Sequence, residues 1–383
     1  FNQLSNAIRF LSVDAVQKAN SGHPGMPMGM ADVATTLFKY HLRFNPKNPN
    51  WINRDRFILS AGHGSMLLYS LLYLCGYESV SIQDIKSFRQ LNSICAGHPE
   101  YKEGSGIETT TGPLGQGLGN AVGMAIAEEV YRKKFGSSLI NNKTYVIASD
   151  GDLMEGVSHE AMSLAGHLKL KNLIVFFDNN KISIDGSTSL SVSDNYKKRF
   201  ESYNWEFLEI NGHSEKEISK AIFKASKSNR PTLISCKTII GFGSPNKSGK
   251  ASSHGSPLGD EEIALVRKKL KWNNKPFEIP QEILDEWRKI GEKGELLEKK
   301  WQEIIDKKNP KIKNKLEKSY NKTELRDLES LIEKQKQKYF EIKPDLATRQ
   351  CSMAAIESIS SILPQLIGGS ADLSGSNNTK TNN

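Results

Sequence analysis

Short apolar runs alternate with amphipathic stretches over the first 260 residues of the chain. The apolar runs predict buried strands at Thr144–Ala148, Leu173–Phe177, Trp205–Ile210 and Thr232–Ser235. Apolar residues at helical spacing predict helices at Asn6–Lys18, Ser65–Leu74, Leu118–Phe135, Ser158–Lys169, Asp194–Tyr203 and Ser214–Ser226. Continuous apolar strands that alternate with helices are typical of a parallel sheet covered on both faces. The pattern therefore predicts an α/β fold with a doubly wound parallel sheet.

The pattern changes after Gly259, where charged helices are predicted at Glu261–Leu270 and Glu282–Lys308. We interpret residues 261–344 as a charged helical extension and linker, and residues 1–260 as the first α/β domain. A helix at Arg349–Ile362 and a short strand at Gln365–Ile367 indicate that residues 345–383 begin a second α/β domain. About 40 residues do not bury a core by themselves. We therefore expect this second domain to be truncated and the chain, which begins with Phe1, to start inside a longer one.

The composition is that of an ordinary soluble globular protein. The chain is 37% hydrophobic and 25% charged, and its length of 383 residues predicts two or three domains. No apolar run approaches the ~18 residues of a membrane-spanning helix, and no export signal is visible, so we expect no membrane partner. The four cysteines have neither metal-ligand nor disulfide-framework spacing, which favours a reducing, cytoplasmic location.

The net charge of +9 raises the question of an anionic partner. More than half of the excess lies in residues 261–344, where 22 Lys and Arg accompany 17 Asp and Glu. The densest basic block, Arg267–Lys271, lacks the interleaved aromatic residues of a base-stacking surface. We interpret this region as a solvated helical surface and expect no nucleic-acid partner.

Oxygen-bearing side chains follow two of the predicted strands directly. Asp150 and Gly151 come just after one strand, and Asn180 follows the next strand along the chain. If the strands are neighbours, Asp150 and Asn180 project into one crevice at the carboxyl edge of the sheet. One carboxylate and one amide suit Mg²⁺ shared with a phosphate group, and Gly151 allows a phosphate to approach the backbone. Each motif taken singly is also typical of a surface turn.

Four of the eight histidines lie in glycine-rich, loop-like contexts: His23, His63, His98 and His254. Zinc is disfavoured because no element carries paired His or Cys ligands. Imidazoles around a polyol or phosphate, where they donate, accept and carry protons, are the more natural interpretation. A third glycine-rich loop, Thr109–Gly117, allows close backbone approach to a ligand and offers Leu114 as an apolar contact.

Together these segments resemble the thiamine-diphosphate enzymes and, within them, the transketolase family. The motif Gly-Asp-Gly, some twenty-odd residues and Asn-Asn stands here as Ser149-Asp150-Gly151 and Asn179-Asn180. Ser149 replaces the first Gly, which leaves the metal ligand and the phosphate-binding Gly intact. The resemblance extends from Asn6 to Ser376 and includes residues 18–25, 54–57, 111–117, 151–156, 237–243 and 368–373.

The resemblance implies a set of site residues for thiamine diphosphate, a metal ion and substrate. It implies that Mg²⁺, with Ca²⁺ or Mn²⁺ as substitutes, is bound by Asp150, Asn180 and the backbone carbonyl of Ile182. It implies cofactor contacts from His63, Gly112, Pro113, Leu114, Gly151, Asn180 and His254, and a role for Glu155 between the two cofactor sites of a homodimer. The implied catalytic histidines at the substrate hydroxyls are His23, His98 and His254. The implied ligands of the substrate phosphate are Arg349 and Ser376.

The implied reaction is the reversible transfer of a two-carbon glycolaldehyde unit between sugar phosphates. A ketose phosphate such as xylulose 5-phosphate is the donor and an aldose phosphate such as ribose 5-phosphate the acceptor, in the pentose phosphate pathway. We expect the 383 residues to lack the second half of the active site, including the glutamate that protonates the aminopyrimidine ring, and to be inactive alone. The alternatives are a dihydroxyacetone synthase and a non-catalytic or split-subunit relative.

Overall fold

The computed structural model describes residues 1–320, 325–363, 365–370 and 372–382. The chain divides into two compact units, Phe1–Ile304 and Ile305–Asn383. These units are defined by internal packing alone. The domain boundaries expected from the sequence, at residues 260 and 344, therefore stay predictions. No helix within the described residues is long and apolar enough to cross a membrane.

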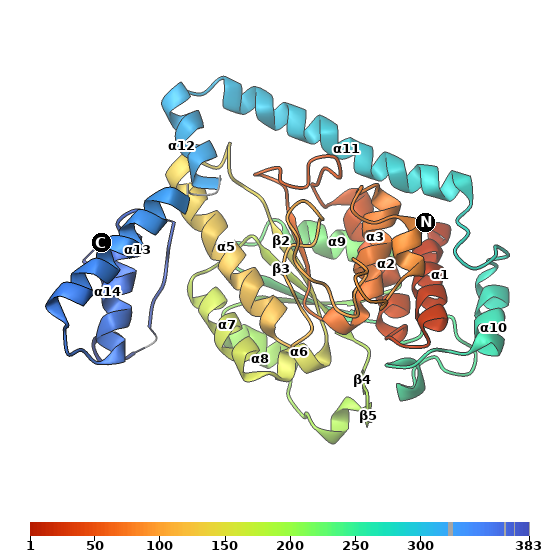
Figure 1. Ribbon diagram of the computed structural model, residues 1–383. Coiled ribbons are helices and arrows are strands. Elements are labelled where there is room, and N and C mark those ends of the chain that lie inside the picture. Colours follow the sequence, from red (N-terminus) through yellow and green to blue (C-terminus); the bar gives the residue numbers. More distant parts are fainter. Residues whose placement is uncertain (321–324, 364, 371, 383) are drawn as a thin grey trace. The chain divides into compact units, whose positions relative to one another are not determined.

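The first unit is built on a five-stranded parallel sheet (Figure 1). The strands are β1 (Arg56–Leu59), β2 (Thr144–Ala148), β3 (Leu173–Asn179), β6 (Glu206–Asn211) and β7 (Thr232–Lys237), in the spatial order β1-β2-β3-β7-β6. The four strands expected from apolar runs are confirmed. β1 was not expected because it has only four residues and begins with a charged one. A small antiparallel pair, β4 (Ile182–Ser183) and β5 (Gly186–Ser187), follows β3.

Alternating side chains of each strand enter two different apolar clusters, one on each face of the sheet. In β2, Tyr145 and Ile147 belong to one cluster, and Val146 and Ala148 belong to the other. The first cluster includes α1 (Asn2–Ala19), α2 (Gly25–Tyr40), α3 (Ser65–Cys75) and α9 (Glu215–Ala225). The second includes α5 (Gln116–Phe135), α7 (Gly156–His167) and α8 (Tyr196–Ser202). This is the doubly wound α/β fold that the apolar pattern predicted.

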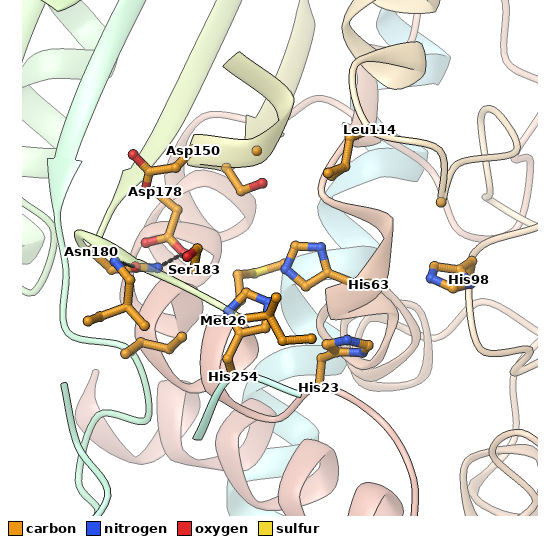
Figure 2. Close-up of a pocket in the computed structure, with 16 residues that line it drawn as sticks. His23, Met26, His63, His98, Leu114, Asp150, Asp178, Asn180, Ser183 and His254 are labelled. Atoms are coloured by element: carbon orange, nitrogen blue, oxygen red, sulfur yellow. Dashed lines mark hydrogen bonds between the residues drawn. The ribbon is translucent and has the colours of Figure 1, made fainter. Parts of the chain in front are cut away.

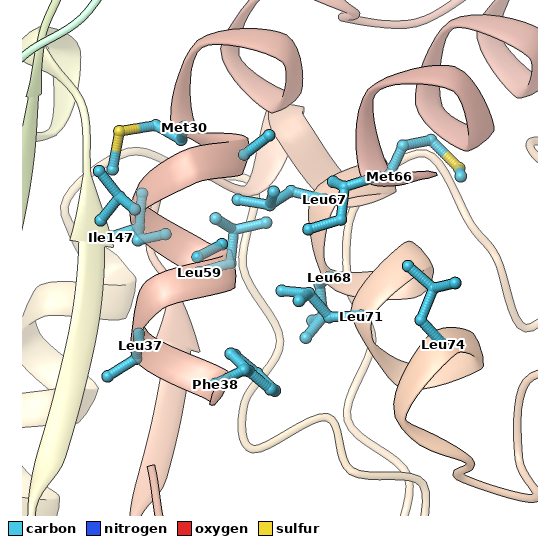
Figure 3. Packing of buried hydrophobic residues seen from close by; sticks show 14 of the residues in the cluster. Met30, Leu37, Phe38, Leu59, Met66, Leu67, Leu68, Leu71, Leu74 and Ile147 are labelled. Atoms are coloured by element: carbon cyan, nitrogen blue, oxygen red, sulfur yellow. The ribbon is translucent and has the colours of Figure 1, made fainter. Parts of the chain in front are cut away.

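Helix α2 is the main element that the pattern did not predict. Its residues from Gly25 to Phe38 are all buried, so it has no polar face from which a helical period is visible. Figure 3 shows Met30 and Leu37 of α2 on the side of Ile147 of β2. Buried between the sheet and α3, this helix fixes the loop before it, which contains His23.

Helices α10 (Asp260–Leu270) and α11 (Gln281–Asp306) confirm the two charged helices predicted at Glu261–Leu270 and Glu282–Lys308. Indole nitrogens anchor α11 to the rest of the first unit: Trp287 donates to the carbonyl of Leu4 (3.3 Å) and Trp301 to that of Leu139 (2.8 Å). A Cβ on Gly291 would lie 2.1 Å from the Cys75 carbonyl oxygen, so the helix packs directly on backbone. Most charged side chains of α11 are exposed, whereas Trp287 and Trp301 are buried.

The second unit contains α12 (Pro310–Tyr320), α13 (Leu325–Ile342), α14 (Thr348–Ser360) and α15 (Ser374–Asn377). Helix α14 confirms the predicted helix at Arg349–Ile362. The predicted strand at Gln365–Ile367 is wrong, because these residues form a turn and irregular backbone. A strand needs a neighbour for its backbone groups, and the described part of this unit contains no strand to pair with. Ala371, in the matching segment 368–373, lies outside the described residues.

Candidate functional site

A cavity of about 300 Å³ lies at the carboxyl ends of β2 and β3 (Figure 2). Strand pairing in register brings Ala148 beside Phe177, so the residues that follow β2 and β3 meet at one edge. Asp150 and Asn180 both line the cavity, which confirms that they share one crevice. Loops from elsewhere in the first unit complete it, including those around His23, Gly112 and His254.

Asp150, Asp178 and Asn180 form one side of this cavity, called the acidic wall below. Asp150 is the first residue of the short helix α6 (Asp150–Met154). Its Oδ1 accepts a hydrogen bond from the Tyr196 hydroxyl (3.3 Å), whereas its Oδ2 is buried with no hydrogen-bond partner. Burial, and then the nearby Asp178 carboxyl, raise the pKa of Asp150 to about 7. A buried carboxylate oxygen without a donor is an unusual feature that a bound cation would satisfy.

Two neighbours fix the orientation of the Asn180 amide. Its Nδ2 donates to Asp178 Oδ2 (2.9 Å), and its Oδ1 accepts from the backbone N–H of Ile182 (2.9 Å). A carboxylate only accepts and a backbone N–H only donates, so the two contacts independently give the same amide orientation. The Thr238 hydroxyl donates to the other oxygen of Asp178. The Asn180 oxygen is thereby set in a defined direction.

Asp178 is a site residue that the sequence prediction missed. Burial raises its pKa to about 6, against the hydrogen bonds from Thr238 and Asn180 that lower it. Asp178 belongs to β3 and is completely buried among strands. The available signal was a carboxylate directly after an apolar strand, one residue before the Asn179-Asn180 pair.

Asp152 joins three segments around the acidic wall. Its Oδ1 accepts from Ser60 Oγ (2.8 Å) and from the backbone N–H of Gly115 (2.9 Å). Its Oδ2 accepts from the backbone N–H of Ser149 (2.9 Å), as part of the capping box that begins α6. Next to it, a Cβ on Gly151 would lie 2.9 Å from Leu114 Cδ1. The glycine therefore permits the glycine-rich loop to approach the start of α6.

His23, His63 and His254 form the opposite side of the cavity, called the histidine wall below. Their ring centroids are 5.2 Å apart for His23 and His63, 5.7 Å for His23 and His254, and 5.2 Å for His63 and His254. Figure 2 shows them across the cavity from Asp150 and Asp178.

Burial is the main cause that keeps these imidazoles neutral. It lowers the pKa of His63 to about 3 and that of His23 to about 4, with smaller contributions from neighbouring rings, and it lowers the pKa of His254. The Nδ1 atoms of His23 and His254 are buried without a hydrogen-bond partner. Neutral rings with unused nitrogens can both donate and accept hydrogen bonds to a ligand.

His98 also lines the cavity, but it is exposed and lies further out than the histidine wall (Figure 2). Its ring occupies the space that a Cβ on Gly112 would need, 3.0 Å from His98 Cγ. Gly112 has φ 139°, a conformation that side chains rarely adopt. Burial and the charge on Arg89 lower the pKa of His98.

The predicted site residues divide into two groups. Those that line the cavity are His23, His63, His98, Gly112, Leu114, Asp150, Gly151, Asn180, Ile182 and His254. Pro113 is not among the lining residues, nor is Glu155, which is exposed between α6 and α7. Arg349 in α14 and Ser376 in α15 belong to the second unit, where both are exposed. The roles of all these residues stay predictions.

Within the described ranges, no group of three or more His, Cys, Asp or Glu side chains is placed to hold a metal ion. The candidate metal position therefore consists of one carboxylate, one amide and backbone. Oxygen donors of this kind match the preference of Mg²⁺, which keeps several waters and shares its remaining positions with phosphates.

Comparison with known proteins gives the family. Residues 2–325 match the family model described as transketolase, thiamine diphosphate binding domain. The chain belongs to the transketolase family. The transketolase of Buchnera aphidicola (subspecies Acyrthosiphon pisum) is 54% identical, with 98% of this chain and 58% of the relative covered. That of Rhodobacter capsulatus is 50% identical, with 99% and 56% covered.

Solved structures of the transketolase family agree with this assignment. The Campylobacter jejuni transketolase superposes with a TM-score of 0.88 at 44% identity, covering 99% of this chain and 58% of that one. The Pichia stipitis transketolase in complex with sedoheptulose 7-phosphate has a TM-score of 0.86 at 40% identity, covering 100% and 57%. The resemblance and the fold predicted from the sequence are confirmed. The chain spans a little over half the length of the relatives it matches.

Proposed function

We propose that this chain supplies the diphosphate-binding part of a transketolase that transfers a two-carbon ketol unit from a ketose phosphate to an aldose phosphate. Family membership and the chemistry of the cavity support the proposal. The observation that carries it is the buried, partnerless Oδ2 of Asp150, on the same cavity wall as the oriented amide of Asn180.

The acidic wall provides the donors for a divalent cation. Asp150, Asn180 and the backbone carbonyl of Ile182 would hold Mg²⁺, and Ca²⁺ or Mn²⁺ would accept the same oxygen ligands. Asp178 accepts a hydrogen bond from Asn180 Nδ2 and so prevents the amide from flipping, which keeps the Asn180 oxygen in the orientation described above. Gly151, at the N-terminus of α6, and the imidazoles of His63 and His254 would contact the diphosphate that shares the metal.

Thiamine diphosphate, when bound, supplies the nucleophilic carbon and the electron sink that breaking a carbon–carbon bond beside a carbonyl requires. The protein residues bind, orient and exchange protons. Gly112, Pro113 and Leu114 would line the cofactor rings, and the apolar Leu114 would exclude water there. His23, His98 and His254 would hydrogen-bond the sugar hydroxyls, because their lowered pKa values keep the rings neutral and able both to donate and to accept.

The substrates of this proposal are sugar phosphates. The Pichia stipitis relative was solved with sedoheptulose 7-phosphate, a molecule of this class. Arg349 and Ser376 would bind the phosphate group, for which the guanidinium provides paired, charge-assisted hydrogen bonds. We further propose a cytoplasmic homodimer of the pentose phosphate pathway, in which Glu155 lies between the two cofactor sites.

The test combines binding with turnover in the complete protein. Thiamine diphosphate is titrated by calorimetry with Mg²⁺ and with EDTA, and a coupled assay follows xylulose 5-phosphate with ribose 5-phosphate. We expect Mg²⁺-dependent binding and transfer of the two-carbon unit. Absence of Mg²⁺-dependent binding in the complete protein would contradict the proposal.

A further inference from the structure

Phe88 and Arg89 lie between the two loops that carry His23 and His98. His23 follows Ser21-Gly22, and His98 follows Ala96-Gly97. Neither Phe88 nor Arg89 belongs to a motif of the sequence or to the segments that resemble the family. Their side chains nevertheless contact both loops at the residues just before each histidine.

On the side of His23, both side chains hold the loop. Arg89 Nη1 donates to Ser21 Oγ (2.7 Å). Gly22 has φ 133°, and a Cβ there would lie 2.9 Å from Phe88 Cε1. The aromatic ring therefore packs against the glycine while the guanidinium binds the serine next to it. The backbone one residue before His23 has little freedom to move.

On the side of His98, Arg89 packs against Gly97. Arg89 Nε is buried without a hydrogen-bond partner, and a Cβ on Gly97 would lie 3.2 Å from it. The backbone N–H of Arg89 donates to the carbonyl of Cys95 (2.9 Å). Arg89 itself has φ 61°, a left-handed conformation that is uncommon for residues with a side chain. The left-handed conformation of Arg89 costs free energy, and the contacts that its side chain makes with both loops hold it in place.

Helix α3 holds the His98 loop independently. The Tyr69 hydroxyl donates to the carbonyl of Ala96 (2.9 Å), and Ser65 Oγ donates to that of Gly97 (2.9 Å). With these residues fixed, Arg89 connects a rigid loop to the loop that carries His23. The side chain thereby links the two.

Besides burial, the positive charge of Arg89 contributes to the lowered pKa of both His23 and His98. Burial and then Arg89 lower the pKa of His98, and Arg89 adds to burial and His254 in lowering the pKa of His23. Both shifts accord with the contacts that Arg89 makes with Ser21 and Gly97.

We propose that Arg89 is a positioning residue, whose guanidinium couples the Ser21–His23 and Gly97–His98 loops and sets the separation of the two histidines for a sugar phosphate. The proposal rests on the proposed function for its substrate class. It assigns to Arg89 no contact with the cofactor or with the reacting atoms.

The kinetic test uses the complete protein with Arg89→Met, Arg89→Lys and Ser21→Ala. We expect Arg89→Met to lower kcat/KM for xylulose 5-phosphate by ~10- to ~100-fold, because small displacements of substrate-positioning groups cost this much. Thiamine-diphosphate affinity should stay within about twofold, since the acidic wall is untouched. Arg89→Lys should recover only part of the loss because lysine lacks the planar fork. The double variant with Ser21→Ala should be no worse than Arg89→Met alone.

The matched control is Arg230→Met, which removes the same group from a surface ion pair with Glu206. It should show wild-type kinetics. Wild-type kcat/KM in Arg89→Met, or full additivity with Ser21→Ala, would overturn the proposal. A large loss of cofactor affinity would also overturn it, because it would indicate a general structural role.

A second readout does not depend on turnover. Nuclear magnetic resonance of histidine-labelled protein follows the titration of His23 and His98 in wild type and Arg89→Met. Removal of the cation should raise both pKa values, and unchanged values would overturn the placement of Arg89. Absence of transfer by the wild-type protein would contradict the proposed function alone, and the titration would still decide the position of Arg89.

Discussion

The acidic wall and the histidine wall meet in one cavity but are assembled in different ways. The acidic wall comes from residues at the ends of two adjacent, hydrogen-bonded strands, β2 and β3. The histidine wall comes from three segments, near residues 23, 63 and 254, that are far apart in the chain. The strand register positions the first wall, whereas side-chain and glycine contacts position the second. The same cavity thus depends on both backbone pairing and loop packing.

Burial also acts on the two walls in opposite directions. It raises the pKa of Asp150 and Asp178 and lowers that of His23 and His63. Both changes reduce the charge of the side chains at neutral pH, because burial disfavours the charged form of any group. A divalent cation on the acidic wall would favour ionised carboxylates, and an anionic diphosphate beside the histidines would favour protonated imidazoles.

The largest expected effect comes from removing the carboxylate of the acidic wall. Asp150→Ala deletes one of the few protein ligands proposed for an octahedral ion, so Mg²⁺-dependent affinity for thiamine diphosphate should fall at least ~100-fold. Calorimetric titration of the complete protein measures it. The control, Asp285→Ala, removes a carboxylate that accepts from Gln281 on the exposed face of α11 and should leave affinity unchanged. Equal affinity in Asp150→Ala and wild type would refute the metal assignment.

Replacement of His23 or His98 should lower turnover but leave cofactor binding unchanged. His23→Ala or His98→Ala should lower kcat with a ketose phosphate by ~10²–10⁴-fold, the usual contribution of a positioned proton-transfer group. Thiamine-diphosphate affinity should remain near wild type. His167→Ala, at the exposed end of α7, is the control. Wild-type rates in both variants would leave these histidines with a purely structural role.

Asp178→Asn tests whether Asp178 contributes to metal binding by orienting the Asn180 amide. The new amide can donate as well as accept, so it no longer forces the Asn180 Nδ2 toward residue 178. We expect Mn²⁺ affinity at this site to fall ~10- to ~100-fold, as is typical for a group that orients a metal ligand. Manganese titration followed by electron paramagnetic resonance measures the loss directly. Unchanged metal affinity would show that the Ile182 N–H alone orients Asn180.

The smallest expected effect is a contribution of His23 to the pH dependence of the free energy of unfolding. His23 has a folded pKa of about 4, below the ~6.5 of an unfolded histidine, so the unfolded chain binds more protons between these values. Stability should therefore fall as the pH drops from ~6.5 toward ~4. The slope for one partly exposed group should stay below ~1.4 kcal/mol per pH unit. Urea unfolding at pH 7 and pH 5.5 should show a shallower dependence in His23→Asn, and identical slopes would contradict the shift.

The sequence predicts that Asp150 and Asn180 share one crevice from sheet geometry, whereas it marks the histidines only by their context, and the difference has a physical reason. Two apolar strands that are followed by Asp150 and Asn180 form a local pattern, and the parallel-sheet geometry brings their ends together. The histidines have no common period or spacing, so the sequence marks them only by their glycine-rich loops and by resemblance. Helix α2, which fixes His23, was hidden because it is buried on every side.

Asp178 and Arg89 illustrate what local patterns cannot supply. Asp178 acts through its contact with Asn180, and a carboxylate after an apolar strand is equally typical of a loop. Arg89 contacts Ser21, 68 positions earlier in the chain. Such residues are found from the contacts of the folded structure, because no spacing in the sequence connects them to the side chains they hold.

The most direct test of the account is the position of the metal ion. Crystals of the complete protein grown with thiamine diphosphate and Mn²⁺ would give an anomalous difference peak for the ion. We predict a peak at ordinary coordination distance from Asp150 Oδ2, Asn180 Oδ1 and the carbonyl oxygen of Ile182, beside the cofactor diphosphate. A peak on the histidine wall, or a bound diphosphate with no metal at Asp150, would contradict the account.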